Sequence, residues 1–125
     1  MTPDAARLAL RPVLDLAPAS APEESFQNET LRPILKLQHD NLATVFRLFL
    51  EKRKVRPEQT PVAARLAKVK ELVTRDNRLR GLLFGMVIGH FTTAEMAYYR
   101  ENDGAVNRRL TNLLGERLSG VFGQS

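Results

Sequence analysis

The sequence contains no cysteine and no tryptophan, and only two of its 125 residues are histidines. The lack of cysteine excludes disulfides, thiolate metal sites and cysteine nucleophiles. Two histidines leave little for metal binding or for acid–base catalysis. The motifs HExxH, GxxxxGK[ST], GxGxxG and GxSxG are absent as well. These absences predict no metal site, no cofactor and no catalytic residue of a recognised type.

The composition is that of one folded domain. Hydrophobic residues make up 43% and charged residues 26%, close to the average for globular domains and unlike a membrane protein. The formal net charge is +5, and the whole positive excess lies in residues 29–80, because residues 1–28 are net acidic and residues 81–125 are neutral. The densest cluster is Lys52, Arg53, Lys54 and Arg56. This run predicts either a contact for phosphates or nucleic acid, or a solvated helix end stabilised by the helix dipole.

Residues 1–28 are expected to form an extended or flexible tail in front of a domain at residues 29–123. Four of the seven prolines lie within the first 25 residues, and proline removes backbone donors and fixes φ. The apolar side chains of AARLALRPVLDL offer a surface for a protein partner. Arg11, Pro12 and Asp15 interrupt that stretch, which argues against a secretory signal and predicts a cytoplasmic protein.

The first long helix is predicted at residues 31–54, with Thr30 as its N-cap and Pro33 in its first turn. An unusually wide apolar face on this helix indicates a central position with more than one neighbour. The face contains Leu31, Ile34, Leu35, Leu42, Val45, Phe46, Leu48 and Phe49. Gln38 projects into it and is expected either to fix register at a helix interface or to be a core glutamine with intramolecular partners.

A second, one-sided helix is predicted from Thr60 and Pro61 to about Asp76. The third segment, LRGLLFGMVIGHF, is apolar in every direction except one, which Gly81, Gly85 and Gly89 line. Each glycine within a helix costs about 1 kcal/mol relative to alanine. Close approach by another helix would offset that cost, so we expect a buried core helix with a helix interface at these glycines; a strand is the alternative.

The strongest local signal lies at the start of the fourth helix. Thr92 and Glu95 have the spacing of a capping box. This helix is predicted to end near Asn102 in a turn, with Asp103 capping a last helix. The sequence therefore predicts an all-α fold, a single small bundle of about five helices with a Pro/Ala-rich N-terminal tail.

Neither histidine has an evident catalytic partner in the sequence. His39 lies at the edge of the apolar face of the first helix, and the adjacent Asp40 diverges from it by 100°. His90 and Glu95 have a spacing that matches no common metal motif. Both histidines are expected to be structural.

Four segments carry a resemblance to a known family: FQNETLRPILKLQHDNL, FLEKRKV, LRGLLFGMVIGHFT and AVNRRLTNLLGERL. Together they resemble a family of small proteins from Bacteroidota-type bacteria that are often labelled "glyoxalase", over about residues 26–118. The label implies a lactoylglutathione lyase. Glyoxalases of the vicinal-oxygen-chelate type hold a metal with His, Glu and Gln on the strands of βαβββ modules. No set of residues here matches those ligands, so no catalytic position is carried over.

The function predicted first is a non-enzymatic helical interaction protein that self-associates as a homodimer. Its interface would use the wide apolar face of the first helix and the glycine-lined face of the third. The second prediction is a nucleic-acid or ribonucleoprotein-associated module that uses the basic residues 52–56. The third is the lyase that the family resemblance implies.

Overall fold

A computed structural model describes residues 1–122 of the chain, and these residues fold entirely into helices and connections, with no strand. The all-α prediction is confirmed. In chain order the helices are α1 (Pro3–Leu10), α2 (Pro22–Phe26), a π-helical turn (Gln27–Leu31), α3 (Arg32–Leu37), α4 (His39–Lys52), α5 (Arg65–Arg75), α6 (Asn77–Ile88) and α7 (Thr93–Ser119). No helix in residues 1–122 is both long enough and apolar enough to cross a bilayer.

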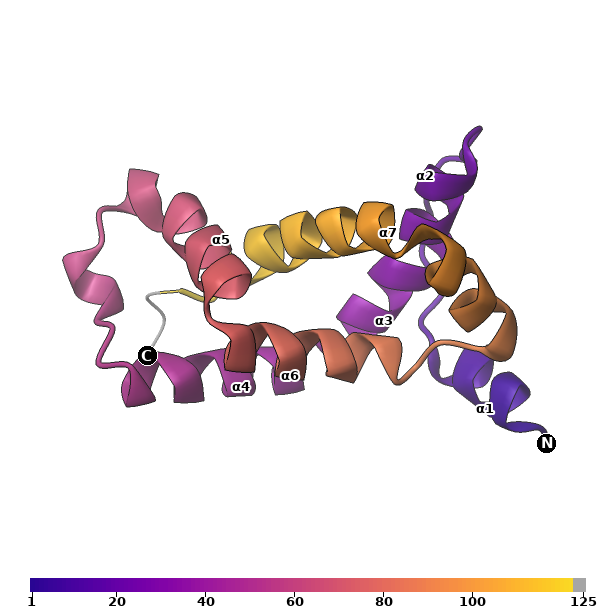
Figure 1. Ribbon diagram of the computed structural model, residues 1–125, viewed down its shortest axis with the longest axis horizontal. Coiled ribbons are helices and arrows are strands. Elements are labelled where there is room, and N and C mark those ends of the chain that lie inside the picture. Colours follow the sequence, from indigo (N-terminus) through magenta and orange to yellow (C-terminus); the bar gives the residue numbers. More distant parts are fainter. Residues whose placement is uncertain (123–125) are drawn as a thin grey trace.

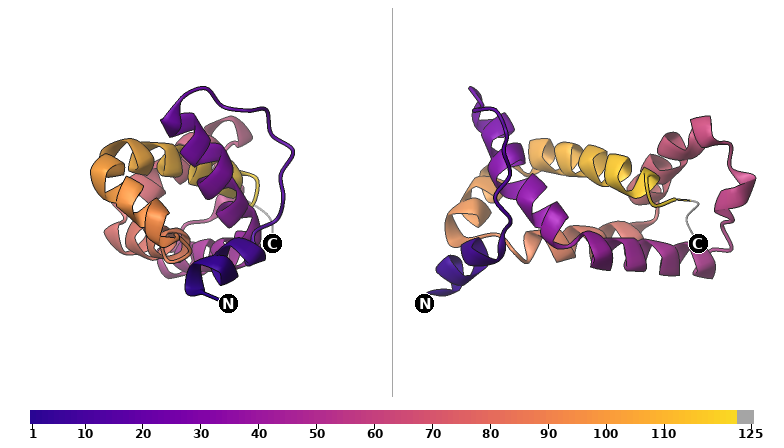
Figure 2. Two further views of the ribbon diagram at one scale, coloured as in Figure 1. Left: turned by 90° about the vertical axis from the view of Figure 1, so that its right-hand side faces the viewer. Right: turned by 180° about the vertical axis from the view of Figure 1, so that it is seen from behind.

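The helices form an elongated arrangement (Figures 1 and 2). Helices α4 and α6 run alongside each other, and α5 packs against the C-terminal half of α7. Helix α1 lies at the opposite end, next to the start of α7. A single core runs between these helices. Its fully buried side chains include Leu31, Ile34, Leu42, Phe46, Val69, Val73, Leu83, Leu110 and Leu114.

The predicted start of the first long helix at Thr30 is wrong. The helix begins at Pro22 and passes through a π-helical turn, in which the Arg32 N–H donates to the Gln27 carbonyl. Pro33 explains the wider turn, because in a regular α-helix its ring would press on the carbonyl four residues earlier. The helix then breaks at Gln38, where φ is −93° and ψ is 5°. Thr30 is 4% exposed inside this helix and caps nothing.

Residues 1–28 are more structured than an extended tail. Thr2 accepts a hydrogen bond from the Ala5 N–H and so caps α1, in which Pro3 occupies the first position. Phe26 belongs to the core, where its ring stacks on Tyr98 at a centroid distance of 4.7 Å. The bundle therefore begins before residue 29. Its predicted end, Gly123, lies outside the described residues.

The second helix also starts later than Thr60. Two 3₁₀ turns, Pro57–Gln59 and Val62–Ala64, precede the first α-helical residue, Arg65. Its predicted end at Asp76 is confirmed. The Asp76 carboxylate accepts a hydrogen bond from the Leu79 N–H at 3.1 Å, so the same residue closes α5 and caps α6.

Helix α7 begins with the predicted capping box, in which the Thr92 hydroxyl accepts from the Glu95 N–H and the Glu95 carboxylate accepts from the Thr92 N–H. The predicted boundary near Asn102 coincides with a break in α7: its φ of −135° and ψ of 25° are not helical, and two helical segments meet there at a kink. The predicted turn with Asp103 as a new N-cap is wrong, because the helix continues through Asp103. The Asn102 amide donates to the Tyr98 carbonyl at 2.9 Å, which supports the kink from within the helix.

Candidate functional site

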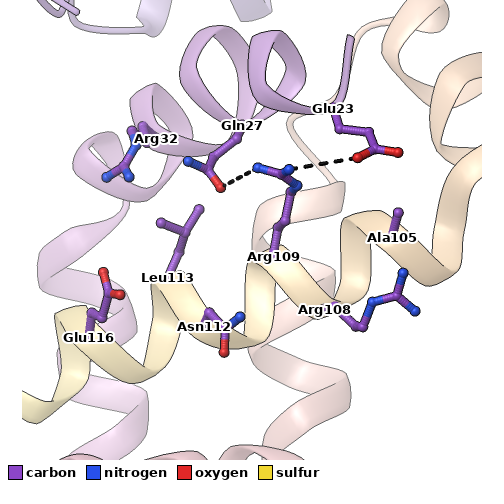
Figure 3. A pocket seen from close by; sticks show the side chains of 9 residues that line it. All are labelled: Glu23, Gln27, Arg32, Ala105, Arg108, Arg109, Asn112, Leu113 and Glu116. Carbon is purple, nitrogen blue, oxygen red and sulfur yellow. Dashed lines mark hydrogen bonds and ion pairs between the residues drawn. The ribbon is translucent and has the colours of Figure 1, made fainter. Parts of the chain in front are cut away.

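A cleft separates the α2–α3 segment from α7, and we refer to it as the α3–α7 cleft (Figure 3). Its volume is about 490 Å³. Three arginines and two glutamates dominate its charge, and the full lining consists of Glu23, Gln27, Arg32, Ala105, Arg108, Arg109, Asn112, Leu113 and Glu116. Such a mixed but net positive surface suits an anionic ligand or partner.

The three arginines of the cleft differ in how many hydrogen bonds and ion pairs they form within the chain. Arg109 points from α7 toward α2, where it donates to the Gln27 side chain at 3.0 Å and lies 3.7 Å from the Glu23 carboxylate (Figure 3). Arg32 donates from Nε to the Asn28 side chain at 3.2 Å. Within residues 1–122, no carboxylate lies within 4.0 Å of Arg32 or Arg108. These two arginines therefore keep guanidinium donors for another molecule.

The cleft continues along α7 toward the first turn of α4. This second part is about 380 Å³ and is lined by Arg32, Leu35, His39, Leu113, Glu116 and Arg117. Arg117 donates to Nδ1 of His39 at 3.2 Å. Burial, together with the nearby positive charge of Arg32, lowers the pKa of Arg117. Two like-charged side chains thus share a partly desolvated space.

His90 is held by Gln38 and is not paired with His39. The Gln38 amide nitrogen and His90 Nε2 are 2.8 Å apart, and because the amide donates, Nε2 accepts. Burial lowers the pKa of His90, and the charges of Arg11 and Arg7 act in the same direction. Gln38 thereby joins the α3–α4 junction to the turn after α6, so this half-buried amide has an intramolecular partner.

Glu95 is the centre of a polar cluster that the sequence did not reveal. Its carboxylate accepts two hydrogen bonds from Arg11 at 2.6 and 2.7 Å and one from the Thr30 hydroxyl at 2.6 Å. It also accepts the Thr92 N–H of the capping box at 2.8 Å. Burial acts to raise the pKa of Glu95, but these hydrogen bonds outweigh it, so the pKa lies below its ordinary value. The cluster ties the N-terminal segment to the start of α7.

No part of this cluster is built to hold a metal. Among the described residues, no group of three or more His, Cys, Asp or Glu side chains is placed to hold an ion. Arg11, which fills the space around Glu95, also donates to the His90 carbonyl at 2.8 Å. The cluster is therefore a structural contact between distant parts of the chain.

The predicted basic run lies at the C-terminal end of α4, with Lys52, Arg53, Lys54 and Arg56 all exposed. Lys54 has a φ of 55°, and this left-handed residue ends the helix. Arg53 forms an ion pair within the chain. It donates to both carboxylate oxygens of Asp76, at 2.7 and 3.2 Å, and hydrogen bonding from Arg53 is the main cause that lowers the pKa of Asp76.

The Arg53–Asp76 contact brings further cations to the same end of the molecule. Arg75 and Arg78 line a shallow hollow of about 410 Å³ together with Arg53 and Asp76. We refer to Lys52, Arg53, Lys54, Arg56, Arg75 and Arg78 as the basic end. The structure therefore enlarges the cationic surface that the sequence run indicated.

The predicted close helix approach at the glycines of α6 is not found within the chain. No other atom lies within 4 Å of the position that a Cβ would take at Gly81 or Gly85, apart from their immediate helical surroundings. Gly89 follows α6, where a Cβ would lie 3.0 Å from the Gly85 carbonyl oxygen. Leu82 is 45% exposed beside these positions. Helix α6 is thus buried on one side only, and its outer face is open.

The wide apolar face of the first long helix is not free for a second copy. Leu35, Leu42 and Phe46 are each at most 1% exposed, because α6 and α7 cover this face within the same chain. The expectation that this face forms a dimer interface is therefore wrong. Apolar side chains that do remain exposed include Leu48 on α4 and Leu8, Leu10, Val13 and Leu16 of the N-terminal segment.

Comparisons of the chain with protein-family models, with curated proteins and with solved structures found no match. The resemblance of residues 26–118 to the glyoxalase-labelled family stays a prediction. The βαβββ modules of vicinal-oxygen-chelate glyoxalases require strands, and residues 1–122 form none.

Proposed function

We propose that the protein is a non-enzymatic helical interaction protein that associates with a second copy of itself. The proposal rests on the hydrogen bonds of the three side chains best suited to acid–base chemistry. His39 is bonded to Arg117 and His90 to Gln38, while Glu95 accepts four hydrogen bonds. Each of these groups joins two helical segments, so the chain meets other molecules through its exposed faces.

The outer face of α6 is the surface we propose for self-association. Gly81 and Gly85 have ordinary helical φ angles and open space around them, so the fold of one chain requires glycine at neither position. Each costs about 1 kcal/mol of helix stability relative to alanine. A helix of a second copy, packed closely over the two glycines and against the exposed Leu82, would offset this cost.

Replacing both glycines with alanine distinguishes an interface on the outer face of α6 from a face that is free in solution. If the face is an interface, the added methyl groups hold the second copy away, and the dissociation constant should rise about tenfold or more. If the face is free, the same change should stabilise the monomer by about 1 kcal/mol per substitution. Sedimentation equilibrium measures the first outcome and thermal unfolding the second.

A matched control is Gly104→Ala on α7, where a Cβ also meets nothing within 4 Å. It should add helix stability and leave association unchanged. A wild-type chain that sediments at its monomer mass of 14.1 kDa at about 100 μM would contradict self-association. So would a G81A/G85A variant that dimerises as tightly as the wild type.

A nucleic-acid or ribonucleoprotein-associated module is the second candidate, and the basic end is the observation that favours it. Four exposed cations at the C-terminal end of α4 and two arginines at the α5–α6 junction share one end of the molecule. Lysine and arginine side chains on phosphates release counterions, so binding of this kind weakens steeply with salt.

The change that tests this candidate is Lys52→Glu with Arg56→Glu, which leaves Arg53 on Asp76 and so preserves the fold. Fluorescence anisotropy with labelled single-stranded RNA and duplex DNA should show a salt slope of about −0.7 to −0.9 per contacted phosphate, and the variant should lose affinity about tenfold or more. Arg100→Glu with Lys36→Glu, both at exposed positions away from the basic end, changes the net charge by the same amount and is the control. Binding that salt does not weaken, or that both variants weaken equally, would contradict a site at the basic end.

A further inference from the structure

Arg32 and Arg117 approach one hollow from two different elements. Arg32 follows the π-helical turn at the start of α3, and Arg117 lies in the last turns of α7. The hollow is the second part of the α3–α7 cleft, about 380 Å³ in volume. It opens to solvent beside the cleft of Figure 3, with which it shares Arg32, Leu113 and Glu116.

Most donors of these two guanidinium groups have no acceptor in the described part of the chain. Arg32 uses only Nε, which bonds to Asn28, and Arg117 uses one Nη, which bonds to His39. An arginine carries five N–H donors in a planar fork. Neither side chain has a carboxylate within 4.0 Å among residues 1–122. The hollow therefore presents several directed donors from two positive charges.

The two guanidinium groups in this hollow repel each other. Burial and the charge of Arg32 both lower the pKa of Arg117, because each disfavours its charged form. Arg117 stays protonated even so, because the pKa of a guanidinium is far above neutral pH. An anion between the two groups would neutralise both charges and accept the remaining N–H groups.

We propose that Arg32 and Arg117 bind the phosphate group of a small phosphate monoester in this hollow. A phosphate monoester offers three acceptor oxygens, so it can accept from both guanidinium groups at once, whereas a carboxylate offers only two. Arginine also binds phosphate with paired, parallel hydrogen bonds. The site uses no residue of α6, so it is independent of the self-association proposed above.

His39 positions one of the two arginines. It accepts from Arg117 at Nδ1 and so orients the guanidinium group. Leu35 and Leu113 lie behind the arginines, but they are only 1% and 7% exposed and so offer a ligand little apolar surface. The hollow is larger than a phosphate ion, so a group attached to the phosphate has room beside the arginines.

Glu116 lines the same hollow and carries the opposite charge. It is exposed and makes no ion pair within residues 1–122, so its carboxylate repels an incoming anion from the rim. Removing this charge should therefore tighten anion binding, and removing either arginine should weaken it. Opposite effects from residues in one hollow are not expected from general loss of stability.

The test is isothermal titration of the full chain with inorganic phosphate, phenyl phosphate and benzoate. Both phosphates should bind with similar affinity, because both present the same group to the two arginines, and benzoate should bind about tenfold more weakly than phenyl phosphate. Arg32→Gln and Arg117→Gln should each reduce phosphate affinity about tenfold or more, and Glu116→Gln should increase it severalfold. Arg100→Gln, elsewhere on α7, should change nothing.

Arg117→Lys is a second, more conservative variant that keeps the test valid if Arg117→Gln fails to fold. Lysine keeps the charge but lacks the planar set of N–H donors of a guanidinium group, so the affinity for phosphate should lie between that of the wild type and that of Arg117→Gln. Circular dichroism checks the fold of each variant. The proposal is overturned if neither phosphate binds at about 10 mM, if benzoate binds as well as phenyl phosphate, or if folded R32Q and R117K variants bind like the wild type.

Discussion

Replacing Arg11 with methionine should lower the free energy of unfolding by about 3–5 kcal/mol, because it leaves the carboxylate of Glu95 without its main charge partner. The side chains of Arg11 and Glu95 are only 6% and 15% exposed. Methionine fills a similar volume but supplies neither of the two hydrogen bonds at 2.6 and 2.7 Å. Urea unfolding followed by circular dichroism measures the loss, since the chain has no tryptophan for fluorescence.

Acid unfolding gives the same substitution a second readout. The folded pKa of Glu95 lies below 4.5, its ordinary value, because hydrogen bonds from Arg11, Thr30 and Thr92 outweigh the effect of burial. A carboxyl of this kind stabilises the fold above the unfolded pKa, and the contribution is lost as the pH falls through the folded pKa. The wild type should lose this stability below about pH 4.5, and the Arg11→Met variant should show a weaker dependence in that range.

Arg7→Met is the matched control for Arg11→Met. Arg7 lies four residues earlier and pairs with Asp4 at 3.4 Å, but both side chains are 39% exposed. An exposed pair of this kind contributes about 0–1 kcal/mol, so the control should unfold almost like the wild type. Equal effects of the two substitutions would show that the N-terminal segment does not dock on Glu95.

Replacing Phe46 with alanine should cost about 3–5 kcal/mol of stability. Phe46 is fully buried on α4, and its ring centroid lies 6.2 Å from that of Phe122, beyond the end of α7. Alanine would leave a cavity where α4 meets Phe122. Urea unfolding at neutral pH measures the loss.

Leu48→Ala tests the same helix on its outer side. Leu48 is 44% exposed, so its truncation removes little buried surface and should cost less than about 1 kcal/mol. A loss below about 1 kcal/mol for Phe46→Ala, or a larger loss for Leu48→Ala, would mean that α4 turns a different face to the core.

The sequence predicts best those features whose partners lie within one or two turns of each other. The capping box of Thr92 and Glu95 is confirmed because a motif four residues long contains both partners. The periodicity of Leu31, Leu35 and Phe46 likewise identifies the face that the core buries. Local pattern thus predicts the all-α class and most of the buried side.

Tertiary contacts override the local pattern at the ends of elements. Thr30 has the side chain of a good N-cap, but its hydroxyl donates to Glu95, 65 residues later, and the helix starts at Pro22 instead. Arg11 reads as part of a proline-rich tail, yet its guanidinium contacts residues of the α7 start. No local signal predicts contacts that span most of the chain.

The sequence does not predict the candidate site for a similar reason. Counting charge along the chain directs attention to Lys52–Arg56, since four cations in five positions stand out. Arg32 and Arg117 are 85 positions apart and only the packing of α3 on α7 brings them to one hollow. The Arg108–Arg109 pair is visible in the sequence, but not its position at the edge of a cleft.

The contact between Arg11 and Glu95 also bears on the order in which the chain folds during synthesis. The two residues are 84 positions apart, so the ribosome releases the N-terminal segment long before its partner exists. Until α7 has emerged, the cation of Arg11 stays hydrated and α1 has nothing to dock on. Closing so long a loop adds an entropic cost that grows with its length. Residues 3–11 should therefore be among the last of the described segments to reach their final place.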